Sequence, residues 1–138
     1  MTKDVLQVVA VLIIQNNSVL LVRHVNSKHI ENIYGLPGGK KEINETEIMG
    51  AKRELEEETG LVASLSDLFR LPTLWRDSVP FKDESIRLCS MRVFRCKHYS
   101  GIIRATEKEI PEWIPLTNVG KLNLLPNVQE AIQEGLRF

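Results

Sequence analysis

Apolar and polar residues alternate in blocks along the chain, and most apolar blocks have the composition of strands. Residues 5–14 are apolar apart from Gln7 and rich in β-branched side chains, which predicts a buried strand. Residues 19–23 repeat this composition after the polar residues 15–18, so the two runs are predicted to form a hairpin. Further extended segments are predicted at residues 61–69, 71–75, 86–96, 102–104 and 112–116. Loops or connectors are predicted at the polar residues 24–33, 76–85 and 107–111.

A long helix is predicted over residues 46–59, which contain no proline and mostly good helix formers. Gly60 follows as a natural left-handed stop. Either Thr46 or Asn44 can cap the start, and with Asn44 as the cap Glu47 would complete a capping box. The glycine-rich residues 34–39 precede this helix, so the local order is predicted to be loop, helix and glycine stop.

A second helix is predicted to begin at Pro126 or Asn127, because apolar residues follow with helical spacing. These residues are Val128, Ala131, Ile132 and Leu136. Strands outnumber helices, and two helices must cover the sheet. The pattern therefore predicts an α/β sandwich, and 138 residues are enough for a single domain with one core, spanning residues 1–138.

The charge balance and the cysteines narrow the class of protein. Eighteen basic and eighteen acidic residues cancel, so net charge does not favour a nucleic acid polymer or a membrane as partner. The apolar residues 5–14 are too few to span a bilayer, and no small-residue cleavage site follows them. Cys89 and Cys96 lie seven positions apart in one predicted strand, which places them on opposite faces and makes a disulfide or a shared metal unfavourable. Free structural thiols predict a reducing, cytoplasmic location.

Three carboxylates of the long helix converge on one flank. With about 100° per residue, Glu54, Glu57 and Glu58 lie together, whereas Glu56 points away. Their charges repel one another, and the C-terminal half of a helix disfavours anions. A run of charge is usually a solvated surface. The other interpretation is a Mg²⁺ site, in which Mn²⁺ can substitute, because a hard cation takes oxygen ligands together with substrate phosphates and would relieve the repulsion.

The same stretch carries a nine-position motif. Its members, at the spacing G-x5-E-x7-R-E-U-x-E-E-x-G-U with U a bulky aliphatic residue, are Gly39, Glu45, Arg53, Glu54, Leu55, Glu57, Glu58, Gly60 and Leu61. The chain therefore resembles the MutT-like Nudix hydrolases at every fixed position of the Nudix box. The resemblance implies the Nudix fold, an α/β architecture in which a mixed β-sheet is sandwiched between α-helices.

The resemblance also implies roles for the box residues. Glu57 and Glu58 are expected to be the main metal ligands, with Glu54 as a further ligand or as the group that acts on water. The carbonyl of Gly38 is expected to join them. Arg53 is expected to orient Glu57, although an ordinary surface pair four residues apart would look the same in the sequence. Structural roles in the loop and at the helix stop are expected for Gly39, Glu45 and Gly60.

Residues outside the box are also implicated. MutT-like enzymes often add an acidic ligand from a distant loop, and the spacing to Glu112 and Trp113 favours Glu107, with Glu109 and Glu112 as rivals. Phosphate contacts are expected from Arg23 and His24. Asn127 matches the region where relatives read a purine edge, although for an asparagine at this position capping the helix is the stronger expectation. Each of these polar residues could also be an ordinary surface side chain.

The resemblance implies hydrolysis of the pyrophosphate linkage in a nucleoside diphosphate joined to another group, with divalent metal. A nucleoside triphosphate, canonical or oxidised, cut to a monophosphate and pyrophosphate is the expected substrate. ADP-ribose, a nucleotide sugar or a dinucleotide is the alternative, and a nucleotide sensor without turnover is an alternative of another class. The expected partner is a small nucleotide, and the chain is expected to be a monomer or a homodimer.

Overall fold

The computed structural model describes residues 5–27, 30–81 and 83–138. Its elements in chain order are β1 (Leu6–Leu12), β2 (Ile14–Gln15), β3 (Ser18–His24), β4 (Tyr34–Gly35), β5 (Gly38–Lys40), α1 (Glu47–Thr59), η1 (Leu65–Asp67), β6 (Leu68–Pro80), β7 (Ile86–Cys96), β8 (Glu109–Pro115), η2 (Leu116–Lys121) and α2 (Val128–Gly135).

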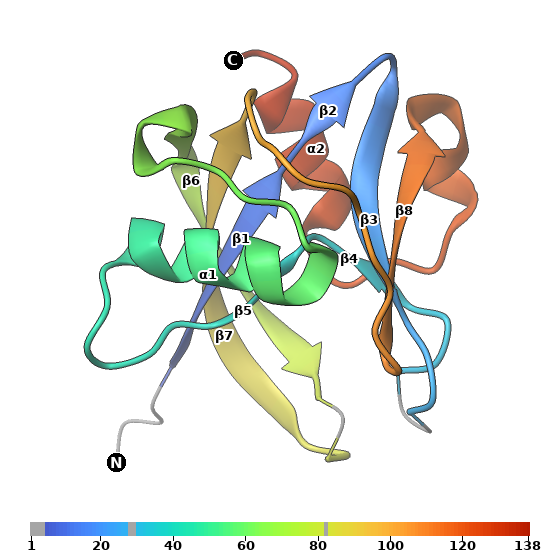
Figure 1. Ribbon diagram of the computed structural model, residues 1–138. Helices are drawn as coiled ribbons and strands as arrows, with labels where there is room; N and C mark the ends of the chain where they lie inside the picture. Colours follow the sequence, from blue (N-terminus) through green and yellow to red (C-terminus); the bar gives the residue numbers. More distant parts are fainter. Residues whose placement is uncertain (1–4, 28–29, 82) are drawn as a thin grey trace.

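The strands form two sheets. One has the order β5-β1-β7-β6, with β1 parallel to β7 and the other pairs antiparallel. The second is built on β3, which pairs with β2, β4 and β8. In Figure 1, α1 crosses in front of the first sheet and α2 lies behind it. The prediction of an α/β sandwich with a mixed sheet between helices is confirmed by the first sheet, whereas the pairs of the second sheet are all antiparallel.

The first apolar run is two strands, not one. It divides at Ile13, which is buried and accepts a hydrogen bond from the amide of Leu20. Residues before this point join β7, and Ile14–Gln15 turn into the second sheet to pair with β3. The predicted hairpin is confirmed between β2 and β3. Its turn residues Asn16 and Asn17 have φ values of 51° and 60°, which asparagine tolerates better than most residues.

The predicted long helix is confirmed. Thr46 is the cap, because its Oγ1 accepts the amide of Met49 at 3.3 Å, and Gly60 ends the helix with φ of 85°. The capping box from Asn44 is not formed. Ala51 and Leu55 face the first sheet in an apolar cluster that includes Val9 and Phe94.

The largest error in the predicted elements concerns residues 76–85. The strand β6 continues to Pro80 and pairs with β7 along its length, so a segment predicted as a loop is half strand. The polar residues 76–78 favoured a loop, and their pairing with β7 joins residues that lie ten to fourteen positions apart in the chain. The pairing shifts register between Arg70 and Leu74, and Pro72, which has no amide N–H to donate, lies inside this interruption.

Of the remaining predictions for the second half of the chain, some are confirmed and others are wrong. The strand over residues 86–96 is confirmed as β7. Residues 102–104 form no strand, and η1 replaces part of the extended segment predicted at 61–69. The last strand begins at Glu109, inside the predicted connector, and η2 was not predicted. Within the irregular segment 24–33, residues 28 and 29 lie outside the described residues.

The second predicted helix is confirmed as α2, with Val128, Ala131 and Ile132 buried and Leu136 exposed. Both cysteines are free and buried, as the spacing indicated. Cys96 belongs to the cluster under α1, whereas Cys89 lines a cavity on the opposite face of the sheet. In the described part of the chain, no helix is long and apolar enough to cross a membrane.

Candidate active site

Two adjacent glycines bring α1 against the first sheet. Gly38 pairs with Ala10 and Gly39 with Val9, so the loop backbone runs as β5 beside β1. A Cβ on Gly39 would lie 2.4 Å from Oε2 of Glu54, and one on Gly38 would lie 2.4 Å from the carbonyl oxygen of Val9. Only a bare backbone fits here, and it lets the carboxylates of α1 reach the strand.

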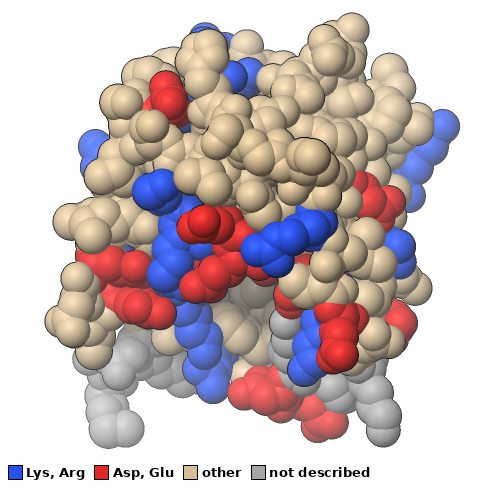
Figure 2. All heavy atoms as spheres, in the orientation of Figure 1, with Lys and Arg blue, Asp and Glu red and all other residues tan. Residues whose placement is uncertain are grey.

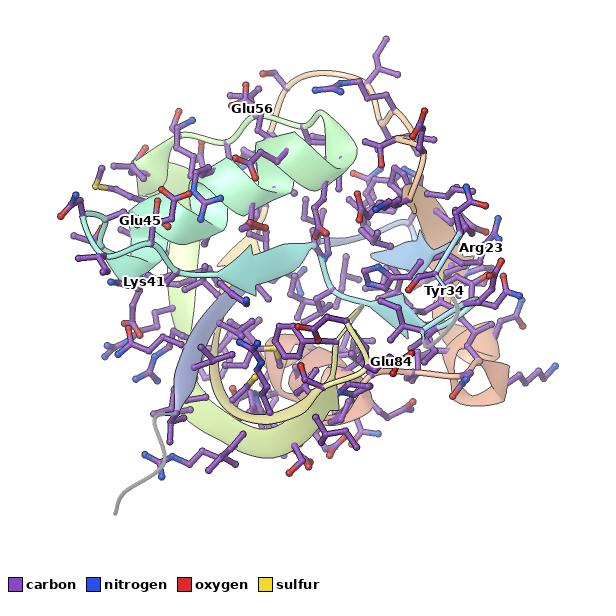
Figure 3. All side chains as sticks on the ribbon, turned by 90° about the horizontal axis from the view of Figure 1, so that it is seen from below. Arg23, Tyr34, Lys41, Glu45, Glu56 and Glu84 are labelled. Carbon is purple, nitrogen blue, oxygen red and sulfur yellow. The ribbon has the colours of Figure 1, made fainter. Side chains whose placement is uncertain are left out.

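Arg53 is the hub of the charged network on α1. Its guanidinium donates to both oxygens of Glu45, at 3.0 and 2.7 Å. It also donates to Glu54 at 3.0 Å, to Glu57 at 3.1 Å and to the carbonyl of Lys40 at 3.1 Å. The predicted Arg53–Glu57 contact is therefore present, but it is one of several. In Figure 3, Glu45 lies beside the first half of α1, at the end of the loop that leads into the helix.

Two carboxylates of this network have pKa values shifted in opposite directions. The hydrogen bonds from Arg53 lower the pKa of Glu45 from 4.5 to about 2. Burial raises the pKa of Glu54, against the opposing effect of Arg53. Two carboxylates bound to one arginine thus differ in proton affinity, and Glu54 binds a proton more readily than Glu45 does.

The other two predicted metal ligands have different environments. Oε1 of Glu58 accepts the amide of Gly38 at 2.7 Å, so the contact between this glycine and the helix is made through its N–H. The side chain of Glu57 is 57% exposed. Glu56 is exposed and lies on the side of α1 away from the space between α1 and the β6–β7 hairpin, as predicted (Figure 3). Acidic and basic side chains interleave in a band over α1 (Figure 2).

A cavity of about 450 Å³ adjoins this network on the α2 side of the first sheet. Glu54, Glu58 and the two glycines form one end of it, and the start of α2 forms another wall. Apolar side chains from β1, β6 and β7 line the floor. A cavity with carboxylates at one end and apolar walls beyond suits a ligand with a phosphate end and a flat apolar end.

Of the three predicted substrate-binding residues, two line the cavity and one does not. His24 and Asn127 line the cavity. Arg23 does not; it donates to Glu112 at 2.6 Å and to Asn32 at 3.3 Å, on the β3–β4 side seen in Figure 3. Asn127 occupies the position before α2 with φ of 68°, and its side chain makes no capping hydrogen bond. The capping interpretation of Asn127 is therefore not supported, which leaves its amide available to a ligand.

The three carboxylates of the connector also differ. Glu112 pairs with Arg23, and Oε1 of Glu109 accepts the hydroxyl of Thr106 at 2.9 Å. Glu107 is exposed and lies outside the cavity lining, and its backbone carbonyl accepts a hydrogen bond from the side-chain Nδ2 of Asn26 at 2.7 Å. The structure does not bring the Glu107 carboxylate to the box residues.

Sequence reasoning missed one wall of the cavity. Trp75, Asp77 and Val79 lie on the cavity face of β6, and Phe81 follows beyond its end. These residues alternate with outward-facing residues, and this alternation, which is visible in the sequence, is typical of a strand. Lys40 was also missed; its ammonium lies 5.1 Å from the centre of the Phe81 ring.

The donor set fits a divalent cation. Glu54 and Glu58 both line the glycine-loop end of the cavity, and Lys40 is the one lysine among its described lining residues. A polyphosphate would be repelled there unless cations came with it, and hard oxygen donors are the ligands that Mg²⁺ and Mn²⁺ prefer. No three His, Cys, Asp or Glu side chains in the described ranges are already grouped to hold an ion. Glu54 and Glu57 instead accept from Arg53, and Glu58 accepts from Gly38.

Comparison with known proteins identifies the class. The model of the NUDIX domain family matches residues 5–134, so the chain belongs to the Nudix family. It is a Nudix hydrolase, an enzyme of the pyrophosphohydrolase class. A search of curated protein sequences finds no match.

Solved structures share the fold. The MutT NUDIX hydrolase of Burkholderia pseudomallei is 20% identical with a TM-score of 0.79, over 96% of this chain and 98% of that one. The NUDIX domain of Shewanella oneidensis NrtR, solved with ADP ribose, is 18% identical with a TM-score of 0.77, over 99% and 89%. The ORF135 protein of E. coli is 21% identical with a TM-score of 0.73, over 96% and 89%. At these identities the likeness concerns the fold alone.

Proposed function

We propose that this Nudix hydrolase requires a divalent cation and cleaves a nucleoside triphosphate, canonical or oxidised, to a monophosphate and pyrophosphate. The observation that carries the proposal is one cavity with two unlike ends. Glu54 and Glu58 line it at the glycine loop, and Asn127 lines it beside apolar walls. A nucleotide has the same two ends, an anionic phosphate chain and a flat base.

The proposed mechanism assigns the box residues as follows. Glu57, Glu58 and Glu54, with the carbonyl of Gly38, would hold Mg²⁺ or Mn²⁺, which when bound neutralises phosphate charge and lowers the pKa of water. Arg53 holds Glu57 and Glu54 at fixed positions through its hydrogen bonds. Glu54 has the raised pKa that suits a group accepting a proton from the attacking water.

Further contacts are proposed around this centre. His24, on the cavity wall, would contact the phosphates, and Asn127 would contact the base. Arg23 could reach the phosphates only by leaving Glu112, so its role there needs a rearrangement of that pair. Glu107 would add a carboxylate from the connector if its exposed side chain turned toward the cations.

A second candidate substrate is ADP-ribose or a related dinucleotide or nucleotide sugar. It is favoured by the likeness to the NrtR domain, which was solved with ADP ribose. A sensor that binds a nucleotide without turnover is less favoured, because every box glutamate is present. We also propose that residues 1–138 form one domain in a reducing, cytoplasmic compartment, as a monomer or a homodimer; the two free buried thiols support the reducing environment.

The test is a panel of nucleoside triphosphates, nucleotide sugars and dinucleotides with Mg²⁺ or Mn²⁺, scored for pyrophosphate or phosphate release. Chelation should stop turnover. Glu57→Gln and Glu58→Gln should each lower kcat by orders of magnitude while Tm stays the same or rises, since they remove repelling charge. Glu56→Gln, on the opposite side of the helix, should be close to neutral. Nucleotide binding without turnover across the whole panel would favour the sensor instead.

A further inference from the structure

One carboxylate, that of Asp77, lies among the apolar walls at the end of the cavity away from the proposed metal site. Asp77 lies on β6, and β1 and β7 separate this strand from the glycines of β5. With neighbouring strands about 4.8 Å apart, the two edges of the cavity floor are roughly 14 Å apart. The length suits a ligand that spans the sheet, with one end at the α1 carboxylates and the other at Asp77.

Asp77 has unused capacity to accept hydrogen bonds. Its Oδ1 accepts the neighbouring amide of Ser78 at 2.8 Å, which orients the carboxylate. No lysine or arginine among the described residues forms an ion pair with it. Its neighbours on the cavity face are Trp75 and Val79, and its partner across the strands is Cys89, which is buried. Asp77 is exposed, so its carboxylate can accept hydrogen bonds from water or from an N–H donor that a ligand brings.

The other carboxylate at this end is already occupied. Asp83 accepts the amide of Ser85 at 3.0 Å and the Ser85 hydroxyl, and it lies 3.5 Å from a guanidinium nitrogen of Arg87. These contacts hold the turn between β6 and β7. Two aspartates therefore line the same end of the cavity, one engaged in the turn and the other available to a ligand.

We propose that Asp77 is a specificity-determining residue that accepts hydrogen bonds from an exocyclic amino group on the base, at the end of the nucleotide away from the phosphates. The proposal rests on the proposed function, because it places the phosphates at α1. A carboxylate has acceptors only, so an amino group facing it gains a charge-assisted hydrogen bond. A carbonyl in the same place sets acceptor against acceptor and leaves both without a partner.

The neighbouring groups complement this selection. The amide of Asn127 carries both a donor and an acceptor, so it can pair with an amino group or a carbonyl and discriminates poorly on its own. The indole of Trp75 offers an aromatic surface on the same face of β6, suited to the flat side of a base. Asp77 is thus the cavity residue best placed to favour bases with amino groups and to reject an anionic group at this end.

The test uses nucleotide pairs that differ by one exocyclic group: dCTP against dUTP, and dGTP against dITP. The wild type should show a kcat/KM at least tenfold higher for the amino member in the pair that contains its best substrate, the effect expected from one hydrogen bond to a charged group. Asp77→Asn should lower that ratio to within about threefold of one, because a neutral amide oxygen accepts more weakly than a carboxylate. In the dCTP–dUTP pair its NH2 group can also donate to the carbonyl of uracil. Asp83→Asn is the matched control and should keep the ratio.

A binding experiment separates this proposal from the proposed function. Calorimetric Kd values for CMP against UMP, and for GMP against IMP, need neither metal nor turnover. Preference for the amino member that disappears in Asp77→Asn supports the specificity role even if no triphosphate is cleaved. The specificity role of Asp77 would be overturned by equal binding within both pairs in the wild type or by an unchanged preference in Asp77→Asn. It would also be overturned if none of the four monophosphates bound.

Discussion

Glu45→Gln is expected to destabilise the fold in a way that depends on pH. The substitution keeps the size of the side chain and removes the charge that pairs with Arg53 through two hydrogen bonds. The Glu45 side chain is only 10% exposed and that of Arg53 24%, so solvent screens the pair less than an ordinary surface pair. Oε1 of Glu45 also accepts the amide of Glu42 at 2.8 Å, which an amide oxygen can still do.

The magnitude follows from the pKa of Glu45. Its fall from 4.5 to about 2 corresponds to about 3 kcal/mol at 1.36 kcal/mol per pH unit. Partial solvent access to the pair reduces the expected loss to about 2 kcal/mol. For a chain of this length that is a drop in Tm of about 8 °C. Because the folded pKa is depressed, the stabilisation is complete above about pH 4.5 and is lost as pH falls toward 2.

The assay is urea unfolding followed by circular dichroism at pH 7 and at steps down to pH 3. Other carboxylates titrate in both proteins, so the quantity compared is the difference in unfolding free energy between wild type and Glu45→Gln. This difference should be about 2 kcal/mol at pH 7 and shrink below pH 4.5. Glu42→Gln is the matched control: its carboxylate lies 3.8 Å from the same arginine but is 68% exposed, and should cost under about 0.5 kcal/mol. A difference that stays constant from pH 7 to pH 3 would refute the pairing argument.

The connector and the last helix supply two further predictions. Glu107→Gln should lose activity at limiting metal and regain part of it with extra Mn²⁺. Glu109→Gln and Glu112→Gln are the controls and should keep near-normal turnover. Equal, mild effects in all three variants would mean that the connector does not contribute to the metal site. Glu134→Ala should lower the unfolding free energy by about 1–3 kcal/mol, because it deprives the Thr73 amide and hydroxyl of their acceptor. Glu130→Ala, one turn earlier and exposed, should change Tm little. A similar drop in both variants would mean that the loss in Glu134→Ala does not come from its contacts with Thr73.

The sequence alone determined the features that depend on neighbours a few residues apart. The carboxylate flank of α1 follows from the helical repeat, and the stop at Gly60 follows from the left-handed backbone that glycine allows. The choice of Thr46 over Asn44 as the cap was left open by the sequence and is made in the structure. The Arg53–Glu57 contact follows from the same repeat, since residues four apart lie one above the other. The Nudix box could be identified from the sequence because nearly all of its residues lie on one helix and the loop before it.

Tertiary structure decided the features that depend on a distant partner. The division of the first apolar run at Ile13, the continuation of β6 through residues 76–80 and the pairing of Arg23 with Glu112 are all set by which strands lie side by side. Strand pairing selects the face on which each side chain lies, and a shift of one residue would exchange the two faces. Asp77 faces the cavity because β6 pairs with β7 in this register, a choice made across the sheet that no local pattern of polar residues contains.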